Sequence, residues 1–437
     1  MPTVFLTEIH GIQEYLSAGG KLKDAVAASD LLDQLWSERF LGKVLQAANA
    51  EPDKAHVIRR AGGAFVALYP DAATAQRLKA LWLLFVAQAL PGVNCVADVA
   101  SGDTLEDALS KGYRALQQQR NHPLPDLPGA SPLTVLNQRT GHSAVRKDPS
   151  PPPGEEAELM DASMTVKRAH FKAMKSEDSA LEEKFGSYKE VHWPRNMDED
   201  FTAHGSDVAV IHADGNGLGV CLHQINIYGK TLQNEDKSCQ LKREFSKILL
   251  EAGEAAARTA TQRVLSKHIY NQIMPARPLV LGGDDLTIIV RADLAMEFTQ
   301  TFCKTFEEAS KKGLKQLRKD FPQLTNLPPT LTICAGVAFV KVNQPFSGSY
   351  KLAESLCDFA KKQGRAIVQG RVKKQGQVNI QDRDHEQHNL IPSAIAFHRP
   401  GASLFDEYDT ILKRDMTVKI DGRPLRLSAG VYGINDA

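Results

Sequence analysis

The sequence lacks the features that mark several large classes of proteins. Its cysteines show no Cys-x-x-Cys pair, which argues against a zinc ribbon and against a disulfide framework. The amino terminus has neither the basic segment nor the cleavage site of a signal peptide. The most apolar segment, residues 78–90, contains Lys79 and Gln88 and is too short to span a bilayer. We therefore expect a protein of the reducing cytosol, with no membrane association.

An excess of charge of one sign is lacking as well. The formal net charge is +1, so no global basic field indicates binding to long nucleic acids, although a local basic site is compatible with it. The 437 residues are 42% apolar and 24% charged, which is ordinary for a globular protein. This length predicts two to three domains.

The chain contains one acidic motif between two apolar β-branched runs. Residues 278–290 read Pro-Leu-Val-Leu-Gly-Gly-Asp-Asp-Leu-Thr-Ile-Ile-Val. This pattern predicts a β-hairpin in which Gly282 and Gly283 allow a tight turn and a close approach to a ligand. Asp284 and Asp285 are then carboxylates at its tip, where they are either solvated or bound to a metal ion. The four letters alone do not decide between these two readings.

A second motif places another carboxylate at the end of a strand. Residues 206–219 read as a buried strand that closes on Asp214, Gly215, Asn216 and Gly217. Three carboxylates brought together are hard oxygen ligands that suit Mg²⁺ or Mn²⁺. We expect Asp214, Asp284, Asp285 and the Gly215 carbonyl to be the metal ligands. Two such ions would clamp the attacking and leaving oxygens of a phosphoryl transfer.

A third motif is a helix that we expect to close on Gly364. Its Lys361 and Arg365 are four residues apart and hence share one face. Taken alone, cations near a helix C-terminus are explained by the helix dipole. Beside the two acidic motifs, they are candidates for binding a triphosphate.

Together and in this order, the three motifs resemble the palm polymerase–cyclase superfamily, and are most similar to the large palm-domain subunit of type III CRISPR effector complexes. The helix motif also resembles that of GGDEF diguanylate cyclases, whose lysine and arginine hold a triphosphate. The resemblance implies catalytic residues Asp214, Asp284 and Asp285. It implies that the nucleotide is bound by the residues listed here: Gly215, Asn216, Gly217, Gly282, Gly283, Lys361 and Arg365.

The resemblance also implies an activity and partners. The chain would be an Mg²⁺- or Mn²⁺-dependent nucleotidyltransferase or cyclase that binds two ATP between its palms and makes cyclic or linear oligoadenylate messengers in antiviral defence. CRISPR effector subunits and guide and target RNA would be its partners. Two alternatives stay open: the palms serve mainly as a scaffold in an RNA-guided effector, or they sense a nucleotide without turning it over.

The order of expected elements occurs twice, which predicts an α+β protein with two ferredoxin-like palm domains and a helical insertion between them. The first palm carries Gly62-Gly63-Ala64-Phe65 where the second carries the acidic turn, so the first is degenerate and the second active. The expected domains are residues 1–125 for the first palm, 126–204 for a proline-rich linker and helical insertion, 205–400 for the second palm and 401–437 for a tail. The expected secondary-structure boundaries are strand 4–9, helices 11–18 and 21–48, hairpin 56–69, helix 71–90, strand 94–100, helix 104–120, strand 208–213, helices 241–266 and 294–317, strand 331–340, helix 350–362 and strands 366–369 and 393–398.

Further expectations come from departures from the family. The family carries a zinc site in the insertion, and the absence of a Cys-x-x-Cys pair predicts that the zinc is missing here. We expect the family's N-terminal nuclease domain and C-terminal helical domain to be absent or vestigial. His212 shares a strand face with Asp214 and is either its supporting partner or a core histidine.

Overall fold

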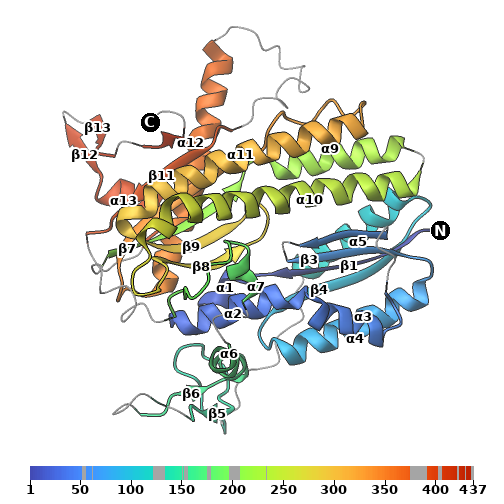
Figure 1. The fold of residues 1–437 in the computed structure, drawn as a ribbon, viewed down its shortest axis with the longest axis horizontal. Helices are drawn as coiled ribbons and strands as arrows, with labels where there is room; N and C mark the ends of the chain where they lie inside the picture. The colour runs from blue at the N-terminus through green and yellow to red at the C-terminus, as the bar shows by residue number, and fades with distance from the viewer. Residues whose placement is uncertain are drawn as a thin grey trace. The chain divides into compact units, whose positions relative to one another are not determined.

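The structure is a computed structural model. It describes residues 1–51, 56–61, 63–121, 133–149, 151, 156–174, 179–195, 207–232, 234–374, 391–401, 406–420, 423–428 and 430–434. The chain forms two compact units (Figure 1), residues 1–180 with 229–246, and residues 181–228 with 247–437. Gly62, Ser206 and much of the expected proline-rich linker lie outside the described residues. The sequence also predicts a charged polar loop at 370–389, of which residues 370–374 are helical and 375–389 lie outside the described residues.

The first unit contains a four-stranded sheet in the order β2-β3-β1-β4, in which neighbouring strands are antiparallel. This is the strand order of a ferredoxin-like β-α-β-β-α-β unit. Its strands are β1 (Thr3–His10), β2 (Val57–Ala61), β3 (Ala64–Tyr69) and β4 (Asn94–Ser101). Its helices are α1 (Ile12–Ser17), α2 (Leu22–Leu35), η1 (Glu38–Gly42), α3 (Lys43–Ala47), α4 (Ala72–Ala89) and α5 (Leu105–Asn121).

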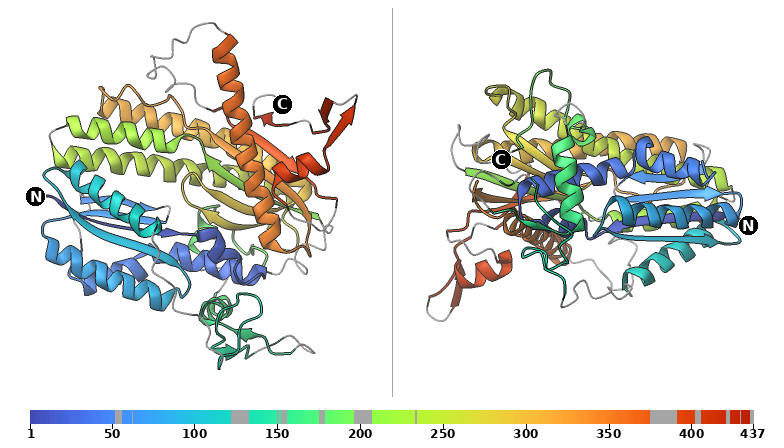
Figure 2. Two further views of the ribbon diagram at one scale, coloured as in Figure 1. Left: turned by 180° about the vertical axis from the view of Figure 1, so that it is seen from behind. Right: turned by 90° about the horizontal axis from the view of Figure 1, so that it is seen from below.

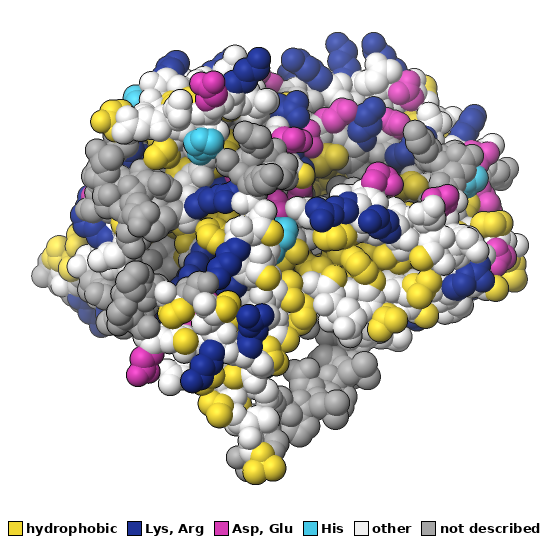
Figure 3. All heavy atoms as spheres, turned by 60° about the horizontal axis from the view of Figure 1, so that its bottom comes forward, with side chains coloured by type: hydrophobic (Ala, Val, Ile, Leu, Met, Phe, Trp, Pro, Cys, Tyr) yellow, Lys and Arg dark blue, Asp and Glu magenta, His cyan; other side chains and the backbone are white. Residues whose placement is uncertain are grey.

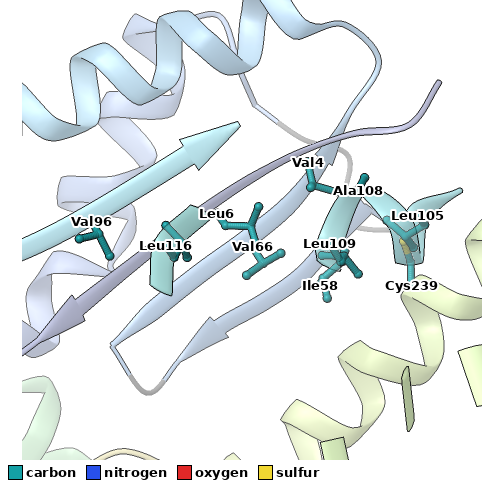
Figure 4. Packing of buried hydrophobic residues seen from close by; sticks show 10 residues of the cluster. All are labelled: Val4, Leu6, Ile58, Val66, Val96, Leu105, Ala108, Leu109, Leu116 and Cys239. Atoms are coloured by element: carbon teal, nitrogen blue, oxygen red, sulfur yellow. The ribbon is translucent and has the colours of Figure 1, made fainter. Parts of the chain in front are cut away.

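Alternate residues of β1 pack against different helices, as the two-residue period of a strand requires. Leu6 belongs to an apolar cluster with Leu109 and Leu116 of α5 (Figure 4). Thr7, its neighbour, accepts a hydrogen bond from the indole of Trp82 on α4 at 2.9 Å. The sheet is therefore covered on both faces, by α5 and by α4.

The helix expected at residues 21–48 is wrong as a single element, because it breaks into α2, η1 and α3. The break follows Trp36, the C-cap of α2, whose carbonyl accepts a hydrogen bond from Arg60 Nε at 2.8 Å. Trp36 also packs its ring on Trp82, with centroids 5.5 Å apart. Tertiary contacts thus end the helix where the apolar pattern alone continues.

A buried ion cluster attaches the inserted segment to the first unit. The segment contains β5 (Arg146–Lys147), β6 (Leu159–Met160) and α6 (Ala162–Ala173). Arg168 of α6 is 5% exposed and contacts the carboxylates of Asp24 on α2, Asp148 and Glu158. A buried guanidinium among carboxylates is stable only when all are paired, so this cluster fixes how α6 packs on α2.

The second unit repeats the strand order in β8-β9-β7-β10 and extends it with β11 and β14. The strands are β7 (Asp207–Gly215), β8 (Ala276–Leu281), β9 (Leu286–Arg291), β10 (Ile333–Lys341), β11 (Ala394–His398) and β14 (Tyr432–Gly433). The last strand comes from the expected tail, which also forms α13 (Tyr408–Arg414) and the hairpin β12 (Thr417–Ile420) and β13 (Arg423–Arg426). Two ferredoxin-like units confirm the predicted α+β fold class.

The remaining helices are α9 (Leu218–Thr231), α10 (Glu235–Ala260), α11 (Ala295–Asp320) and α12 (Phe346–Lys374), with the short α7 (Ala180–Glu183), η4 (Thr261–Leu265), η5 (Ser266–His268) and η6 (Ala292–Leu294). Of these, α11 and α12 pack on the strands of the second sheet (Figures 1 and 2). We predicted no element at the residues of α9. The helix expected at 241–266 begins earlier and ends at Ala260.

The predicted end of the third motif's helix at Gly364 is wrong, and so is the strand expected at residues 366–369. The helix α12 continues through both to Lys374. A Cβ at Gly364 would lie 2.5 Å from Cγ2 of Ile391, so this glycine allows close packing inside the helix. Figure 2 shows α12 crossing the sheet and extending past its edge.

The pairing register corrects the alignment of the two turns by one residue. In the first unit, Ala61 pairs with Ala64 and flanks the two loop residues. In the second, Gly282 and Asp285 are the flanking pair, since the Gly282 N–H donates to the Asp285 carbonyl at 2.9 Å. Ala64 therefore stands at the position of Asp285, and Phe65 does not.

Two surface properties agree with the composition. None of the helices among the described residues is both long and apolar enough to cross a membrane. On the face drawn in Figure 3, lysine and arginine side chains lie among acidic and apolar ones. The near-zero formal charge thus reflects charges of both signs that share the surface.

Candidate functional site

The site begins where β7 ends. The strand is buried through Ala213 because it is paired on both sides, with β9 and β10. The next residue, Asp214, is in register with Cys334 of β10 and has a side chain that is 41% exposed. A carboxylate at the first exposed position after a buried strand is held in a fixed direction by the sheet.

The acidic turn lies between β8 and β9. Gly283 has a φ of 82°, which suits the first loop position of a type II′ turn and is unfavourable for residues with a Cβ. The Gly283 carbonyl lies directly against Gly253 of α10, where any Cβ would overlap it. The turn therefore packs directly on α10, which has a glycine, and hence no side chain, at the point of contact.

The turn and the end of β7 meet in the second unit, as predicted. A Cβ placed on Gly215 would lie 2.9 Å from Cβ of Asp284 and 3.0 Å from its Oδ2. Since Ala213 pairs with Leu286, continuing the register brings Asp214 beside Asp285. All three predicted catalytic carboxylates therefore lie around one corner of the sheet.

Asp285 is the most perturbed of these carboxylates. A third of its side-chain surface is exposed, yet its Oδ1 is buried and accepts no hydrogen bond from the described residues. Burial, with the nearby Asp214 carboxylate adding to it, raises the pKa of Asp285 to about 7. A buried oxygen beside a second carboxylate is stabilised by a cation.

His212 lies close to Asp285. Its contacts fit both roles expected from the sequence, a partner of the carboxylates and a core histidine. It is 6% exposed and its ring packs edge-on against Tyr350, with centroids 5.5 Å apart. Its Nδ1 is 3.3 Å from Thr287 Oγ1 and 3.7 Å from Asp285 Oδ1. Burial lowers the pKa of the imidazole, so His212 is a neutral core histidine that touches Asp285.

The helix α12 brings Lys361 to Asp214. The close approach depends on Gly336 of β10, where a Cβ would overlap the Ala353 carbonyl and lie 2.5 Å from the Cys357 nitrogen. Lys361 Nζ donates to Asp214 Oδ2 and, at 3.2 Å, to the Gly215 carbonyl. Burial disfavours the charge of Lys361, but the Asp214 carboxylate outweighs it and raises the pKa of the ammonium.

Arg365 lies one turn further along the same helix. It is exposed, whereas Lys361 is 13% exposed. Because α12 continues to Lys374, neither residue is at a helix C-terminus, and the helix dipole does not explain the two cations. An exposed guanidinium beside a paired ammonium leaves Arg365 accessible to an anion.

The predicted nucleotide-binding residues at the β7 turn differ in accessibility. Gly217 is exposed and has a φ of 69°. Asn216 is 1% exposed, and its amide donates to Thr332 Oγ1 at 3.1 Å while its N–H donates to the Thr332 carbonyl at 2.9 Å. The Asn216 side chain thus anchors the turn to the sheet, and Gly217 exposes its backbone to solvent.

Three residues of the site were not singled out from the sequence. Gly253 and Gly336 allow the close approaches described above, and an isolated glycine inside a helix or strand pattern is the signal that could have found them. Glu354 lies on the same helix as Lys361, and burial followed by the charge of Asp358 raises the pKa of its carboxyl. Its seven-residue spacing from Lys361 puts both on one face of α12.

The oxygen atoms at this corner suit a hard divalent cation. They comprise carboxylates and the Gly215 carbonyl, and they include the buried Oδ1 of Asp285 that lacks a hydrogen bond. In the described part of the chain, no three His, Cys, Asp or Glu side chains converge closely enough to hold an ion as they stand. The Asp214 carboxylate is turned to Lys361. The residues therefore fit a cation once this ion pair separates.

Comparisons with known proteins identify a related family and a related fold. Residues 207–368 match the family model described as Cas10/Cmr2, second palm domain. Among curated proteins there is no match. The chain is similar to chains in three structures of a Csm1–Csm4 cassette, one without ligand, one with cA4 and one with one ATP.

Each of these three structural matches has a TM-score of 0.50 at 12% identity and covers 83% of this chain and 53% of the matched chain. The chain thus spans about half the length of these relatives. At this identity, the structural matches establish a shared fold alone. The residues matched by the family model include the three carboxylates, Lys361 and Arg365. Residues 207–368 therefore match the Cas10/Cmr2 second-palm model, which confirms the predicted resemblance to the palm-domain subunit of type III CRISPR systems.

Proposed function

We propose that this protein is a metal-dependent nucleotidyltransferase that joins ATP molecules into cyclic or linear oligoadenylates. The 3′-hydroxyl of one ATP attacks the α-phosphate of another, and pyrophosphate leaves. The observation that carries the proposal is the convergence of Asp214, Asp284 and Asp285 at one corner of the second sheet, beside Lys361. Such a site supports phosphoryl transfer by positioning and charge.

The proposed role of each residue follows from where it lies in the site. Asp214, Asp284, Asp285 and the Gly215 carbonyl would hold Mg²⁺ or Mn²⁺, which when bound lowers the pKa of the attacking hydroxyl and neutralises phosphate charge. Lys361 and Arg365 bind the triphosphate from one face of α12. Backbone groups at Gly217, Gly282 and Gly283 let the nucleotide approach without a side chain in the way.

The test is direct. The protein is incubated with each of ATP, GTP, CTP and UTP in turn with Mg²⁺ or Mn²⁺, and the products are separated by chromatography with pyrophosphate measured in parallel. Oligoadenylates and pyrophosphate from ATP are expected. Binding of ATP with no pyrophosphate release would contradict catalysis and support a palm that senses nucleotides without turnover.

A second candidate function is a subunit of an RNA-guided effector in which the palms also act as a scaffold. The observation that favours it is the similarity to chains of Csm1–Csm4 cassettes. Under this proposal, the protein co-purifies with other effector subunits and guide RNA, and its synthesis of oligoadenylates rises when target RNA is added. Full activity of the isolated protein, unchanged by RNA, would count against it.

A further inference from the structure

We propose that Lys361 and a divalent cation compete for the same oxygen atoms, so that the cation binds tightly only when a nucleotide takes up Lys361. The proposal deepens the proposed function and rests on it in one respect, the identity of the nucleotide as ATP. The competition itself depends only on the geometry around Asp214.

The geometry places one ammonium on two predicted metal ligands. Lys361 Nζ donates both to Asp214 Oδ2 and to the Gly215 carbonyl, the latter at 3.2 Å. A divalent cation at this corner needs oxygen ligands from the same two residues. An ammonium and a divalent cation held by the same carboxylate and carbonyl repel each other strongly in a half-buried site. Binding of one therefore weakens binding of the other.

The remaining charges explain why Lys361 would leave only for a nucleotide. Lys361 is 13% exposed, so an ammonium that lost Asp214 would be left unpaired in a largely buried position. A triphosphate offers several anionic oxygens in its place, and Arg365 on the same face can bind the same anion. The nucleotide thus removes the cost of separating Lys361 from Asp214, which couples the two binding events positively.

The first unit contains an equivalent pair of an acid and a cation that does not lie beside predicted metal ligands. Glu8 of β1 occupies the register position of Asp214, and Arg120 of α5 contacts it at 3.3 Å. Both cations are fifteen residues after the first residue of their helix, at 105 for α5 and 346 for α12. The first unit has Ala64 where the second has Asp285. Arg120 therefore has an acid to pair with but no metal site to block.

The experiment measures Mn²⁺ affinity of the full chain without nucleotide, by electron paramagnetic resonance of free Mn²⁺. In Lys361→Met, the dissociation constant for Mn²⁺ should fall about tenfold or more relative to the wild type, because a charge-assisted competitor is removed. Lys361→Arg keeps a cation and should stay near the wild type. Arg120→Met and Lys362→Met are matched controls and should leave the Mn²⁺ affinity unchanged.

A second measurement tests the coupling. Addition of a non-hydrolysable ATP analogue should tighten Mn²⁺ binding in the wild type and should tighten it by a smaller factor in Lys361→Met. Lys361→Gln replaces the methionine variant if the latter does not fold, as judged by its melting curve.

Either of two results would overturn the competition: Mn²⁺ affinity that is equal in the wild type and in both neutral variants, or no Mn²⁺ binding in any of them. The outcomes are independent of the proposed function. A wild type that makes no pyrophosphate from ATP, while Lys361→Met binds Mn²⁺ more tightly, would refute the synthesis of oligoadenylates and leave the competition standing. Turnover with equal Mn²⁺ affinities would do the reverse.

Discussion

The two ferredoxin-like units share the order of four strands but differ in the turn between the second and third of them, at one corner of each sheet. In the first unit this turn leads into buried apolar residues, since Ala64 is 2% exposed and Phe65 beside it is 1% exposed. In the second unit the same corner carries Asp284 and Asp285 on a turn that stands clear of the ladder. The fold therefore does not need the acidic turn, and the turn is present for another reason than stability.

One ion pair is common to both units. A strand acid pairs with a cation on the helix that follows the fourth strand, Glu8 with Arg120 in one unit and Asp214 with Lys361 in the other. What distinguishes the second unit is the acidic turn next to that pair. The same ion pair is therefore structural in the first unit and part of the candidate site in the second, where two further carboxylates lie beside it.

The largest effect on activity is expected when the two acids that distinguish the second unit, Asp284 and Asp285, are neutralised. Asp284→Asn with Asp285→Asn should lower the rate of product formation about a thousandfold or more, because the cation ligands are lost. The melting temperature should not fall, since the buried Asp285 carboxyl is repelled by Asp214. Chromatography of products and a melting curve on one preparation check both.

Exposed Glu297 supplies the control for that pair of changes, and Glu297→Gln should match the wild type in both measurements. Product formed by the double variant at the wild-type rate would mean that the acidic turn is not the catalytic site.

The next largest effect, a loss of stability, is expected when two acids are introduced into the equivalent turn of the first unit. Gly63→Asp with Ala64→Asp places acids at the positions of Asp284 and Asp285. Ala64 is buried, and Gly63 has a φ of 73° with Ile12 Cδ1 only 3.2 Å from an added Cβ. We expect a loss of roughly 2–4 kcal/mol in the free energy of unfolding and no added activity. Denaturant unfolding measures the loss, and a stable variant with doubled activity would break the comparison.

A smaller effect is expected from the exposed cation of the second unit. Arg365→Ala should raise the KM for ATP about tenfold while leaving the melting temperature unchanged, because the side chain is exposed and its proposed partner is the triphosphate alone. Arg365→Lys should recover part of the loss, since lysine lacks the planar fork of arginine. A lower melting temperature with unaltered KM would assign Arg365 to the fold instead.

The smallest effect is expected from the matching cation of the first unit. Arg120 is 43% exposed, and such ion pairs contribute about 0–1 kcal/mol to stability. Arg120→Ala should lower the free energy of unfolding within that range and leave the KM for ATP unchanged. A KM that rose as much as in Arg365→Ala would show that the first unit also binds the substrate.

Local patterns predicted the four strands that the two sheets have in common and the residues at the corner, because alternating apolar runs and glycine turns are properties of neighbouring residues. They failed at residues 366–369, which are helical, and missed the strands of the tail. They did not predict where helices end. Gly364 reads as a stop, yet it is an interior position packed on Ile391. Asn216 reads as part of a ligand loop, yet Thr332 holds its side chain inside. Both depend on segments that are distant in the sequence.

Gly336 carries a consequence for how this protein can change over time. The Lys361 position depends on α12 lying close to β10, and one methyl group at residue 336 would collide with the Ala353 carbonyl. A single substitution to alanine, which alters no charge and lies in the interior, would lift the helix from the strand. The proposed activity can therefore be lost along an evolutionary path that preserves every charged residue of the site, and a lineage inactivated in this way would still display all three motifs intact.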